Sequence, residues 1–386
     1  QPVALEMPLD QLAGACNVDL LDAATDYTHP PVDEDAVAGA AKLLAGAKAP
    51  MIFVGSGAVD SGEAIQALAE ILQAPVIANR TGRGIVSNRN YLSMMHLEGH
   101  RLWADADVVL AVGTRLQPAR MNWGTGGDLK IIHVDIDPVE IKRIATPDVA
   151  IVGDAQDIVP ALVDAVARQA PSRASREDEL MALRGDVHAM LLDRLGPQMS
   201  WIKVIREALD DDGIFVDELT QVGYVSRVAM PIYQPRKYLS SAYQGTLGCG
   251  LGVAIGAKIA NPDRQVLSIN GDGGFMYNVQ ELATAAKYNV NVVAIVFADG
   301  AFGNVRRMQE ELYDGRTIAS DLKNPDFVKM AESFGCAAYR ADSPDELAKV
   351  LPNAFKEAGP AVIEVPFPKT PDPWPIIIPR HNRPSG

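Results

Sequence analysis

The chain has 386 residues, with 49 acidic and 35 basic side chains and a formal net charge of −14. This charge disfavours binding to nucleic acid and to anionic membranes, which repel an acidic protein. The composition, 48% hydrophobic and 22% charged, is typical of a folded protein rather than a disordered one. At roughly 100–200 residues per domain, the length predicts two or three domains.

The three cysteines, Cys16, Cys249 and Cys336, lie far apart in the sequence and form no CxxC pair. They favour neither a zinc cluster nor a disulfide framework, and we expect a reducing, cytoplasmic location. No apolar run reaches the roughly 18 residues that would span a bilayer. The first residue is Gln1 rather than Met, and we expect further sequence upstream.

An irregular lead-in, residues 1–30, precedes a first block at residues 31–170 in which strands and helices alternate. Helical spacing of apolar side chains predicts helices at 61–73 and 155–168. Short apolar runs predict the strands of this block at 51–55, 76–79, 108–113 and 130–137.

Residues 171–195 contain proline, serine and a charged run, and we expect a solvated linker that becomes helical. A second block, residues 196–366, again alternates strands and helices. Its predicted strands are 213–217, 264–270, 290–298, 337–341 and 361–365.

One helix of the second block has explicit end signals. Ser343 is suited to the N-cap, Pro344 to the first turn and Glu346 to a capping box, and Gly359 is suited to the end. The tail, residues 367–386, is rich in proline, and we expect it to lie along the surface as neither a helix nor an inner strand.

Strands separated by single helical segments predict an α/β protein with two doubly wound parallel sheets. Ligands of such sheets bind outside the carboxyl ends of the strands. We therefore expect the functional site in the segments that directly follow the strands.

Two acidic turns follow neighbouring predicted strands. Gly271-Asp272-Gly273-Gly274 comes directly after one strand, and Asp299-Gly300 comes after the next, so that the two aspartates are 27 positions apart. This spacing fits one β-α-β unit, so both carboxylates are expected at the same sheet edge. Either turn alone is typical of an ordinary tight turn. Together they favour a magnesium–phosphate site, because Mg²⁺ prefers oxygen ligands and glycines let the backbone approach a phosphate.

These two turns resemble the thiamine diphosphate motif, which begins Gly-Asp-Gly and closes with an Asn pair. Gln280–Ala285 and Gly245–Gly252 are similar to the acetolactate synthase, oxalyl-CoA decarboxylase and benzoylformate decarboxylase group. Residues 31–170 resemble the central domain of this group, which binds FAD in some members. The resemblance covers essentially the whole chain.

The resemblance implies a role for each matching residue. It implies that the Asp272 and Asp299 side chains and the Ala301 carbonyl bind Mg²⁺. It implies that Leu247 holds the cofactor bent and that the Gly245 carbonyl faces its aminopyrimidine amine. It further implies that the diphosphate is contacted by Gly273, Gly274, Phe302 and Gly303, and by a second loop, Thr220, Gln221 and Val222.

The activity that the resemblance implies is thiamine diphosphate- and Mg²⁺-dependent decarboxylation or ligation, with a 2-keto acid or an acyl-CoA relative as the substrate. The alternative is a non-catalytic or partner-dependent nucleotide-binding or regulatory subunit that retains the fold. The group's catalytic glutamate lies in an N-terminal pyrimidine-binding domain. We expect that domain from the rest of the chain or from a second polypeptide, within a homodimer or homotetramer, and the catalytic residue is unknown.

The chain departs from the group at several positions. Ala298-Asp299 stands where members have Asn-Asn, and Gln117-Pro118 replaces the acidic pair that follows the flavin-binding Gly-Ala-Arg. We therefore expect no bound FAD, with FAD binding as the alternative. His96 and His100 are expected on a loop or the surface rather than at a metal, and Trp374 is a candidate lid over the cofactor.

Overall fold

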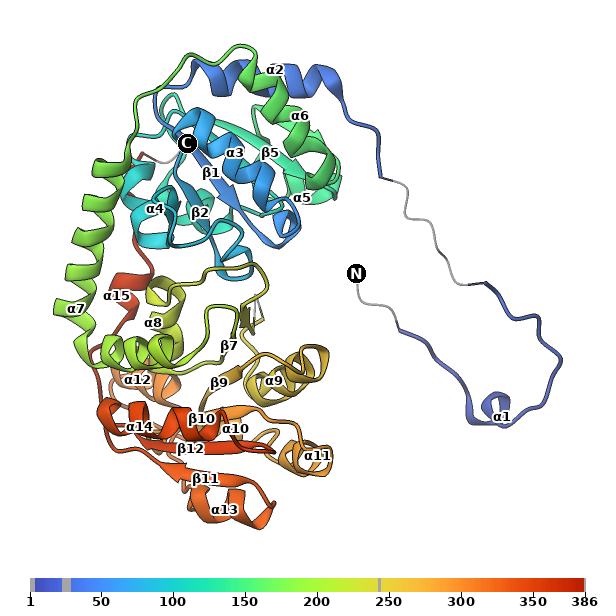
Figure 1. Ribbon diagram of the computed structural model, residues 1–386, viewed down its shortest axis with the longest axis vertical. Helices are drawn as coiled ribbons and strands as arrows, with labels where there is room; N and C mark the ends of the chain where they lie inside the picture. The colour runs from blue at the N-terminus through green and yellow to red at the C-terminus, as the bar shows by residue number, and fades with distance from the viewer. Residues whose placement is uncertain (1–3, 23–28, 242–243, 385–386) are drawn as a thin grey trace.

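The computed structural model describes residues 4–22, 29–241 and 244–384 of the chain. Two six-stranded sheets form its framework, and every pair of neighbouring strands in them is parallel. Each sheet has helices on both faces, and the two sheets lie one above the other along the long axis (Figure 1). This architecture confirms the expected α/β class with two doubly wound domains.

The first sheet has the strand order β3-β2-β1-β4-β5-β6. Every residue of β1 and β4, at its centre, is buried, as expected for parallel strands covered on both faces. Its strands are β1 (Pro50–Val54), β2 (Val76–Ala78), β3 (Ser93–Met94), β4 (Val108–Val112), β5 (Lys130–Asp135) and β6 (Val149–Val152). Its helices are α2 (Glu34–Gly46), α3 (Gly62–Leu72), α4 (His96–Trp103), α5 (Pro138–Lys142) and α6 (Ala155–Ala167).

The second sheet has the order β11-β12-β10-β9-β7-β8. Its strands are β7 (Ile214–Asp217), β8 (Tyr238–Ser240), β9 (Val266–Gly271), β10 (Val293–Ala298), β11 (Ala337–Arg340) and β12 (Ala361–Pro366). Its helices are α8 (Gln221–Ala229), α9 (Cys249–Ala260), α10 (Asp272–Phe275), α11 (Glu281–Lys287), α12 (Gly303–Leu312), α13 (Phe327–Ser333) and α14 (Pro344–Ala354). Strands β9 and β10 are neighbours, so the two acidic turns emerge at the same edge.

The expected capping of α14 is present. The Ser343 hydroxyl accepts a hydrogen bond from the Glu346 amide at 3.3 Å, and the Glu346 carboxylate accepts one from the Asp342 amide at 2.8 Å. The helix ends at Ala354, five residues before the glycine that was expected to end it. The last turn is followed by Phe355 and Lys356, whose amides bond back to Leu351 and Asn353.

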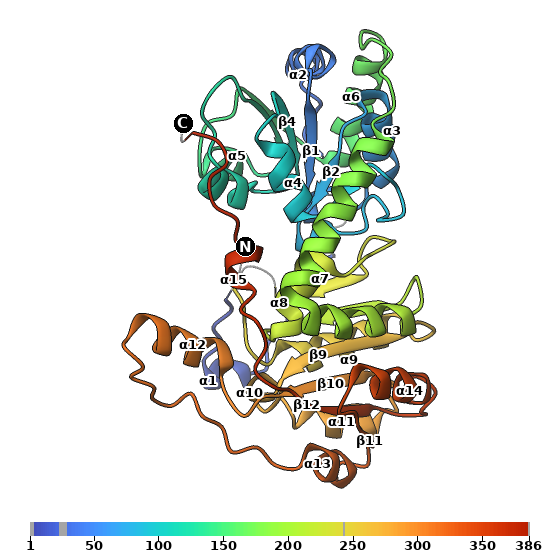
Figure 2. The same ribbon diagram turned by 90° about the vertical axis from the view of Figure 1, so that its left-hand side faces the viewer.

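The linker expected at 171–195 is mostly a packed helix. α7 (Glu177–Ala208) runs past residue 195 and bends at Leu195, whose backbone is not helical. Leu180, Val187 and Leu191 are buried along one side, at a helical spacing that the surrounding charges conceal in the sequence. Figure 2 shows α7 extending along both domains, and it packs against α4, α8 and α14. The helix therefore fixes how the two sheets are arranged.

The proline-rich tail is not merely a surface segment. It contains a short helix, α15 (Trp374–Ile377), which was not expected. The helix tolerates Pro375 because this proline lies at the second helical position. Beyond α15 the tail crosses to the central domain (Figure 2), where the Arg383 guanidinium donates to the carbonyls of Trp103 and Ala106 at 2.9 and 2.5 Å. The carbonyl of Pro384 accepts from the Gly126 amide at 2.8 Å.

Within its described residues, the lead-in meets the central domain near its end, where His29 pairs with Asp157 of α6 at 2.5 Å. Residues 4–22 are exposed and carry only α1 (Leu9–Leu12), while residues 1–3 and 23–28 lie outside the described part of the chain. No helix among the described residues is long and apolar enough to cross a membrane.

Replacing Arg383 by alanine is expected to lower the free energy of unfolding of the central domain by about 2 kcal/mol, because buried carbonyls lose a charged donor. Urea denaturation of both proteins measures the difference. Arg380→Ala is the matched control, because Arg380 contributes a backbone carbonyl near His100 that survives the substitution. Equal stabilities of the Arg383 and Arg380 variants would show that the tail contact is not stabilising.

Candidate functional site

A cavity of about 200 Å³ lies at the carboxyl edge of β7, β9 and β10. It is lined by residues from four loops, including most of those singled out in the sequence. Those that line it are Thr220, Gln221, Gly245, Leu247, Asp272, Gly273, Gly274, Asp299, Ala301, Phe302 and Gly303. Val222 does not line it, because its side chain points into the hydrophobic core of the domain. The expected contact of Val222 can therefore involve only its backbone.

Asp272 is the more rigidly held of the two carboxylates. It starts α10 directly after β9 and is only 1% exposed. Its Oδ1 atom accepts from the Gly273 amide at 2.8 Å, and its Oδ2 atom accepts from the Gly300 amide at 2.8 Å and from Asn324 Nδ2 at 2.6 Å. These three donors fix the orientation of the carboxylate toward the loop that carries Asp299.

Asp299 follows β10 and accepts a hydrogen bond from the Ala301 amide at 3.1 Å. Burial, with a further contribution from the negative charge of Asp272, raises the pKa of Asp299 to about 6. A buried carboxylate whose charged form is disfavoured by a second carboxylate is suited to a cation, which would stabilise that form.

The backbone around Ala301 leaves a third oxygen for a metal. Ala301 forms an isolated antiparallel bridge with Asp321, and its hydrogen bonds join Gly300 to Leu322 and Phe302 to Ser320. That bridge does not use the Ala301 carbonyl. Within the described residues no group of three or more His, Cys, Asp or Glu side chains could hold a metal. Two carboxylates and a carbonyl are oxygen ligands of the kind that suits Mg²⁺, which usually keeps water or phosphate oxygens as its other ligands.

The cavity also has backbone suited to an anion. α8 and α12 both begin at its wall, and Thr220 caps α8 by accepting from the Gly223 amide at 2.9 Å. Gly245 has a φ of +61°, a conformation that favours glycine. Leu247 is 36% exposed and faces the cavity, which argues against the alternative that it is an ordinary core residue.

Several lining residues gave no usable sequence signal. Tyr224 and Phe367 resemble core residues in an apolar run, and they line the cavity only because α8 and the tail begin beside it. Asn324 lies in an irregular segment 52 residues from Asp272, so no periodicity connects the two. Asn304, in the first turn of α12, also lines the cavity.

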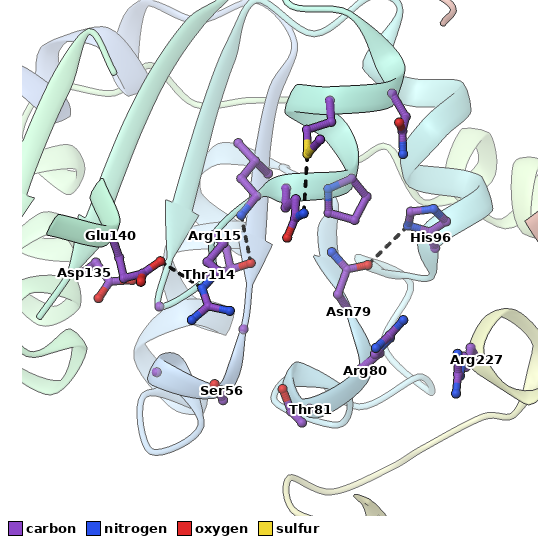
Figure 3. Close-up of a pocket in the computed structure, with 18 of the residues that line it drawn as sticks. Ser56, Asn79, Arg80, Thr81, His96, Thr114, Arg115, Asp135, Glu140 and Arg227 are labelled. Carbon is purple, nitrogen blue, oxygen red and sulfur yellow. Dashed lines mark hydrogen bonds and ion pairs between the residues drawn. The ribbon is translucent and has the colours of Figure 1, made fainter. Parts of the chain in front are cut away.

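A second, larger cavity of about 880 Å³ lies at the carboxyl edge of the central sheet and extends to α8 and α15. Its wall includes the turns after β1 and β4 and the end of β5. Figure 3 shows Arg115 beside Glu140, to which its Nε atom donates at 2.8 Å, and Arg227 approaching from α8. Burial, and then the charge of Arg227, lowers the pKa of Arg80. Tyr224 lines both cavities and stands between them.

The two histidines, expected on a loop or the surface, both lie on the helix α4, and His100 is partly exposed there. His96 faces the larger cavity, with Nδ1 3.2 Å from Asn79 Oδ1 (Figure 3) and its ring centroid 4.8 Å from that of Trp123. Burial, with smaller contributions from His100 and Arg80, lowers the pKa of His96 to about 4.

Trp374 lines the larger cavity rather than the smaller one, so the lid hypothesis placed it over the wrong opening. Its ring packs 4.8 Å from that of Tyr224. Arg306 pairs with Asp321, and Arg307 with Glu311 at 2.5 Å, so both arginines already have carboxylate partners.

The pKa of His96 predicts a pH effect on stability. The pKa of this histidine is about 4 in the folded protein and 6.5 in the unfolded chain, so protonation favours the unfolded chain. The free energy of unfolding is therefore not reduced by this residue above pH 6.5, and it falls as the pH decreases toward 4. Between about pH 7 and pH 5 we expect a loss of about 2 kcal/mol from this residue. In urea denaturation at both pH values, His96→Gln should show a loss smaller by that amount. An equal loss in both proteins would mean that His96 does not cause it.

Comparisons with known proteins agree with this geometry. The family model described as the thiamine pyrophosphate enzyme central domain matches residues 37–162, and that of the C-terminal TPP-binding domain matches residues 220–365. A probable 2-ketoarginine decarboxylase from Pseudomonas aeruginosa is 33% identical over 374 residues, which are 95% of this chain and 66% of that protein.

Two further relatives carry another name. A probable acetolactate synthase large subunit from Methanococcus aeolicus is 33% identical over 86% of this chain and 59% of its own length. The acetolactate synthase isozyme 1 large subunit of Escherichia coli is 28% identical over 98% of this chain and 69% of its own. The chain spans about two thirds of the length of the curated relatives it matches. With a central and a C-terminal TPP-binding domain, the chain belongs to the thiamine pyrophosphate enzyme family.

Proposed function

We propose that this protein is a thiamine diphosphate- and Mg²⁺-dependent decarboxylase or carboligase that acts on a 2-keto acid. The observation that carries the proposal is the cavity at the ends of β9 and β10. It brings the carboxylates of Asp272 and Asp299 together beside glycine turns and two helix starts. An oxygen-binding cation and a diphosphate are the ligands that such an arrangement fits.

Each proposed contact uses a residue of the cavity wall. Asp272, Asp299 and the Ala301 carbonyl would hold Mg²⁺, and the Gly245 carbonyl would accept from the aminopyrimidine amine. Leu247 would support the bent cofactor. The diphosphate would meet the backbone of Thr220, Gln221, Val222, Gly273, Gly274, Phe302 and Gly303, with Val222 contributing only its amide.

When bound, thiamine diphosphate supplies an electron sink for cleavage of the bond between a carbonyl carbon and its carboxylate. The chain's own residues orient the cofactor and exclude water. Phe297, Phe302 and Phe367 form an apolar part of the wall, which strengthens electrostatic contacts inside the cavity.

We propose that the acid–base carboxylate comes from an N-terminal pyrimidine-binding domain, of the same or a neighbouring chain, in a homodimer or homotetramer. Among the described residues that line the smaller cavity, the carboxylates are Asp272 and Asp299, and both are assigned to the metal. An acyl-CoA substrate is the second possibility for the reaction. A cytoplasmic location is supported by Cys16, Cys249 and Cys336, which are free thiols.

A partner-dependent or regulatory subunit remains the alternative function. Turnover of 2-keto acids by the full protein, with thiamine diphosphate and Mg²⁺, separates the two. An enzyme releases CO₂ or forms a ligated product, whereas a regulatory subunit binds without turnover.

Calorimetric titration with thiamine diphosphate tests the cofactor site directly. We expect binding in Mg²⁺ and its loss in EDTA, because the diphosphate and the carboxylates need the cation between them. Asp299→Ala should lose the Mg²⁺-dependent binding. Asp263→Ala, an exposed carboxylate in the turn before β9, is the control and should bind as the parent does. Unchanged affinity in Asp299→Ala would remove that residue from the site.

We propose that the larger cavity binds a second ligand, a nucleotide that contains no flavin. Its position at the carboxyl edge of the sheet, between β1 and β4, is where doubly wound sheets bind nucleotides. Arg80 brings positive charge to its wall, while Arg227, also in the wall, is paired with Asp217. Gln117 and Pro118, in place of an acidic pair, support the preference against flavin.

Calorimetric titrations with ADP and with FAD test this proposal. ADP should bind and the purified protein should lack flavin absorbance. Arg80→Gln should weaken ADP binding roughly 10-fold, as expected for a lost charged hydrogen bond. Bound flavin in the purified protein, or no binding of ADP, would contradict the proposal.

A further inference from the structure

Glu218 is a buried carboxylate that has no part in the proposed chemistry. It follows β7 and is 0% exposed, next to Asp217, which is equally buried and pairs with Arg227 at 2.8 Å. Neighbouring residues at a strand end point to opposite sides of the sheet. The Asp217 side chain therefore lies toward α8, and the Glu218 side chain lies toward the start of α9.

Both carboxylate oxygens of Glu218 accept backbone hydrogen bonds from one loop. Oε1 accepts from the Gly248 amide at 2.8 Å, and Oε2 accepts from the Gly250 amide at 3.0 Å. Gly248 is the N-cap of α9, and the amides at a helix start have no partner within the helix. Burial raises the pKa of Glu218, and these two donors oppose that effect.

The first of these bonds fixes a peptide that belongs to the cofactor cavity. The Gly248 amide is part of the peptide that also carries the Leu247 carbonyl, and Leu247 lines the cavity. The next peptide is held from the other side, where Asn278 Nδ2 donates to the Gly248 carbonyl at 2.7 Å. Two consecutive peptide planes beside Leu247 are therefore fixed by side chains.

The same carboxylate also contacts the turn that carries Asp272. A Cβ atom at Gly274 would lie 1.9 Å from Glu218 Oε1, and one at Gly250 would lie 2.7 Å from Oε2. Glycine at both positions is what allows the carboxylate to fit between the Leu247 loop and the Asp272 turn. A side chain in this place sets the distance between the two loops.

We propose that Glu218 is a positioning residue, which holds the Leu247 loop in register with the Asp272 turn so that the cavity is shaped for the cofactor before it binds. This inference rests on the proposed function for the identity of the cofactor. The positioning role itself concerns the chain alone, because the groups that Glu218 binds are backbone amides of this chain. Glu218 also occupies the amides at the start of α9, so an anion in the cavity is left with the starts of α8 and α12.

Glu218→Gln tests the inference with little change in shape. One amide nitrogen would replace an acceptor and face a backbone N–H, so one of the two bonds is lost. We expect faster hydrogen exchange in residues 245–250 of the unliganded protein, measured by mass spectrometry. We also expect the affinity for thiamine diphosphate in Mg²⁺ to fall roughly 10-fold or more. The KM for the cofactor should rise more than kcat falls at saturating cofactor.

Glu98→Gln is the matched control, because Glu98 is a buried carboxylate of α4 in the central domain, outside the linings of both cavities. It should leave exchange at 245–250 and the affinity for thiamine diphosphate unchanged. A Glu218→Gln protein that behaves in the same way would overturn the inference and leave Glu218 a purely stabilising residue.

The two proposals can fail separately. If the parent protein does not bind thiamine diphosphate, the proposed function is wrong, while hydrogen exchange still decides whether Glu218 holds the loop. If Glu218→Gln does not fold, Glu218→Asp is measured in the same way. It keeps the charge, but one methylene less prevents it from reaching both amides, so exchange at 245–250 should still increase.

Discussion

The close approach of two carboxylates at one sheet edge is the constraint on which the site depends. Asp272 and Asp299 follow adjacent parallel strands, and the pKa of Asp299 is raised because burial and a neighbouring charge disfavour its ionised form. A fold keeps such a pair only if something else compensates for it. Backbone amides and Asn324 compensate part of the charge of Asp272. A divalent cation would compensate the rest, and its remaining positions would be open to phosphate oxygens.

The architecture around this pair places two cavities next to each other. The smaller lies at the edge of the second sheet and the larger at the edge of the first, with Tyr224 of α8 in both walls. α7 and the tail both span the two domains, and Arg383 anchors the tail on carbonyls of the central domain. The spacing between the cavities therefore depends on packing and hydrogen bonds far from either one. A change in the tail can reach both cavities through Trp374 and Tyr224.

Most of the fold could be predicted because buried parallel strands are short apolar runs. The central strands β1, β4 and β10 were found within a few residues of their ends. The edge strands β3, β6 and β8 were missed, since they are short and, in β6, partly exposed. The sequence of residues 171–195 favours a solvated linker that becomes helical, because charged residues separate the buried positions of α7, such as Val187, and conceal its packed side. The short helix in the tail could not be predicted, because proline is tolerated there only in its first turns.

The smaller cavity was predictable because both aspartates and their glycines follow strands directly. Contacts between distant loops could not be predicted, because no regular sequence spacing connects Asn324 to Asp272 or Glu218 to Gly248. The Val222 side chain lies in the core, so the expected contact of this residue with the cofactor can come only from its backbone. His96 was placed at the surface because a single histidine pair does not reveal which side of a helix is covered. Tertiary packing, rather than local pattern, decided each of these cases.

The metal position can be located directly by growing crystals with thiamine diphosphate and Mn²⁺ in place of Mg²⁺ and measuring anomalous scattering. A single strong peak within coordination distance of the Asp272 carboxylate, the Asp299 carboxylate and the Ala301 carbonyl is the result we predict. A peak elsewhere in the protein, or bound cofactor with no peak between these three groups, would contradict the assignment of this sheet edge as the metal–diphosphate site.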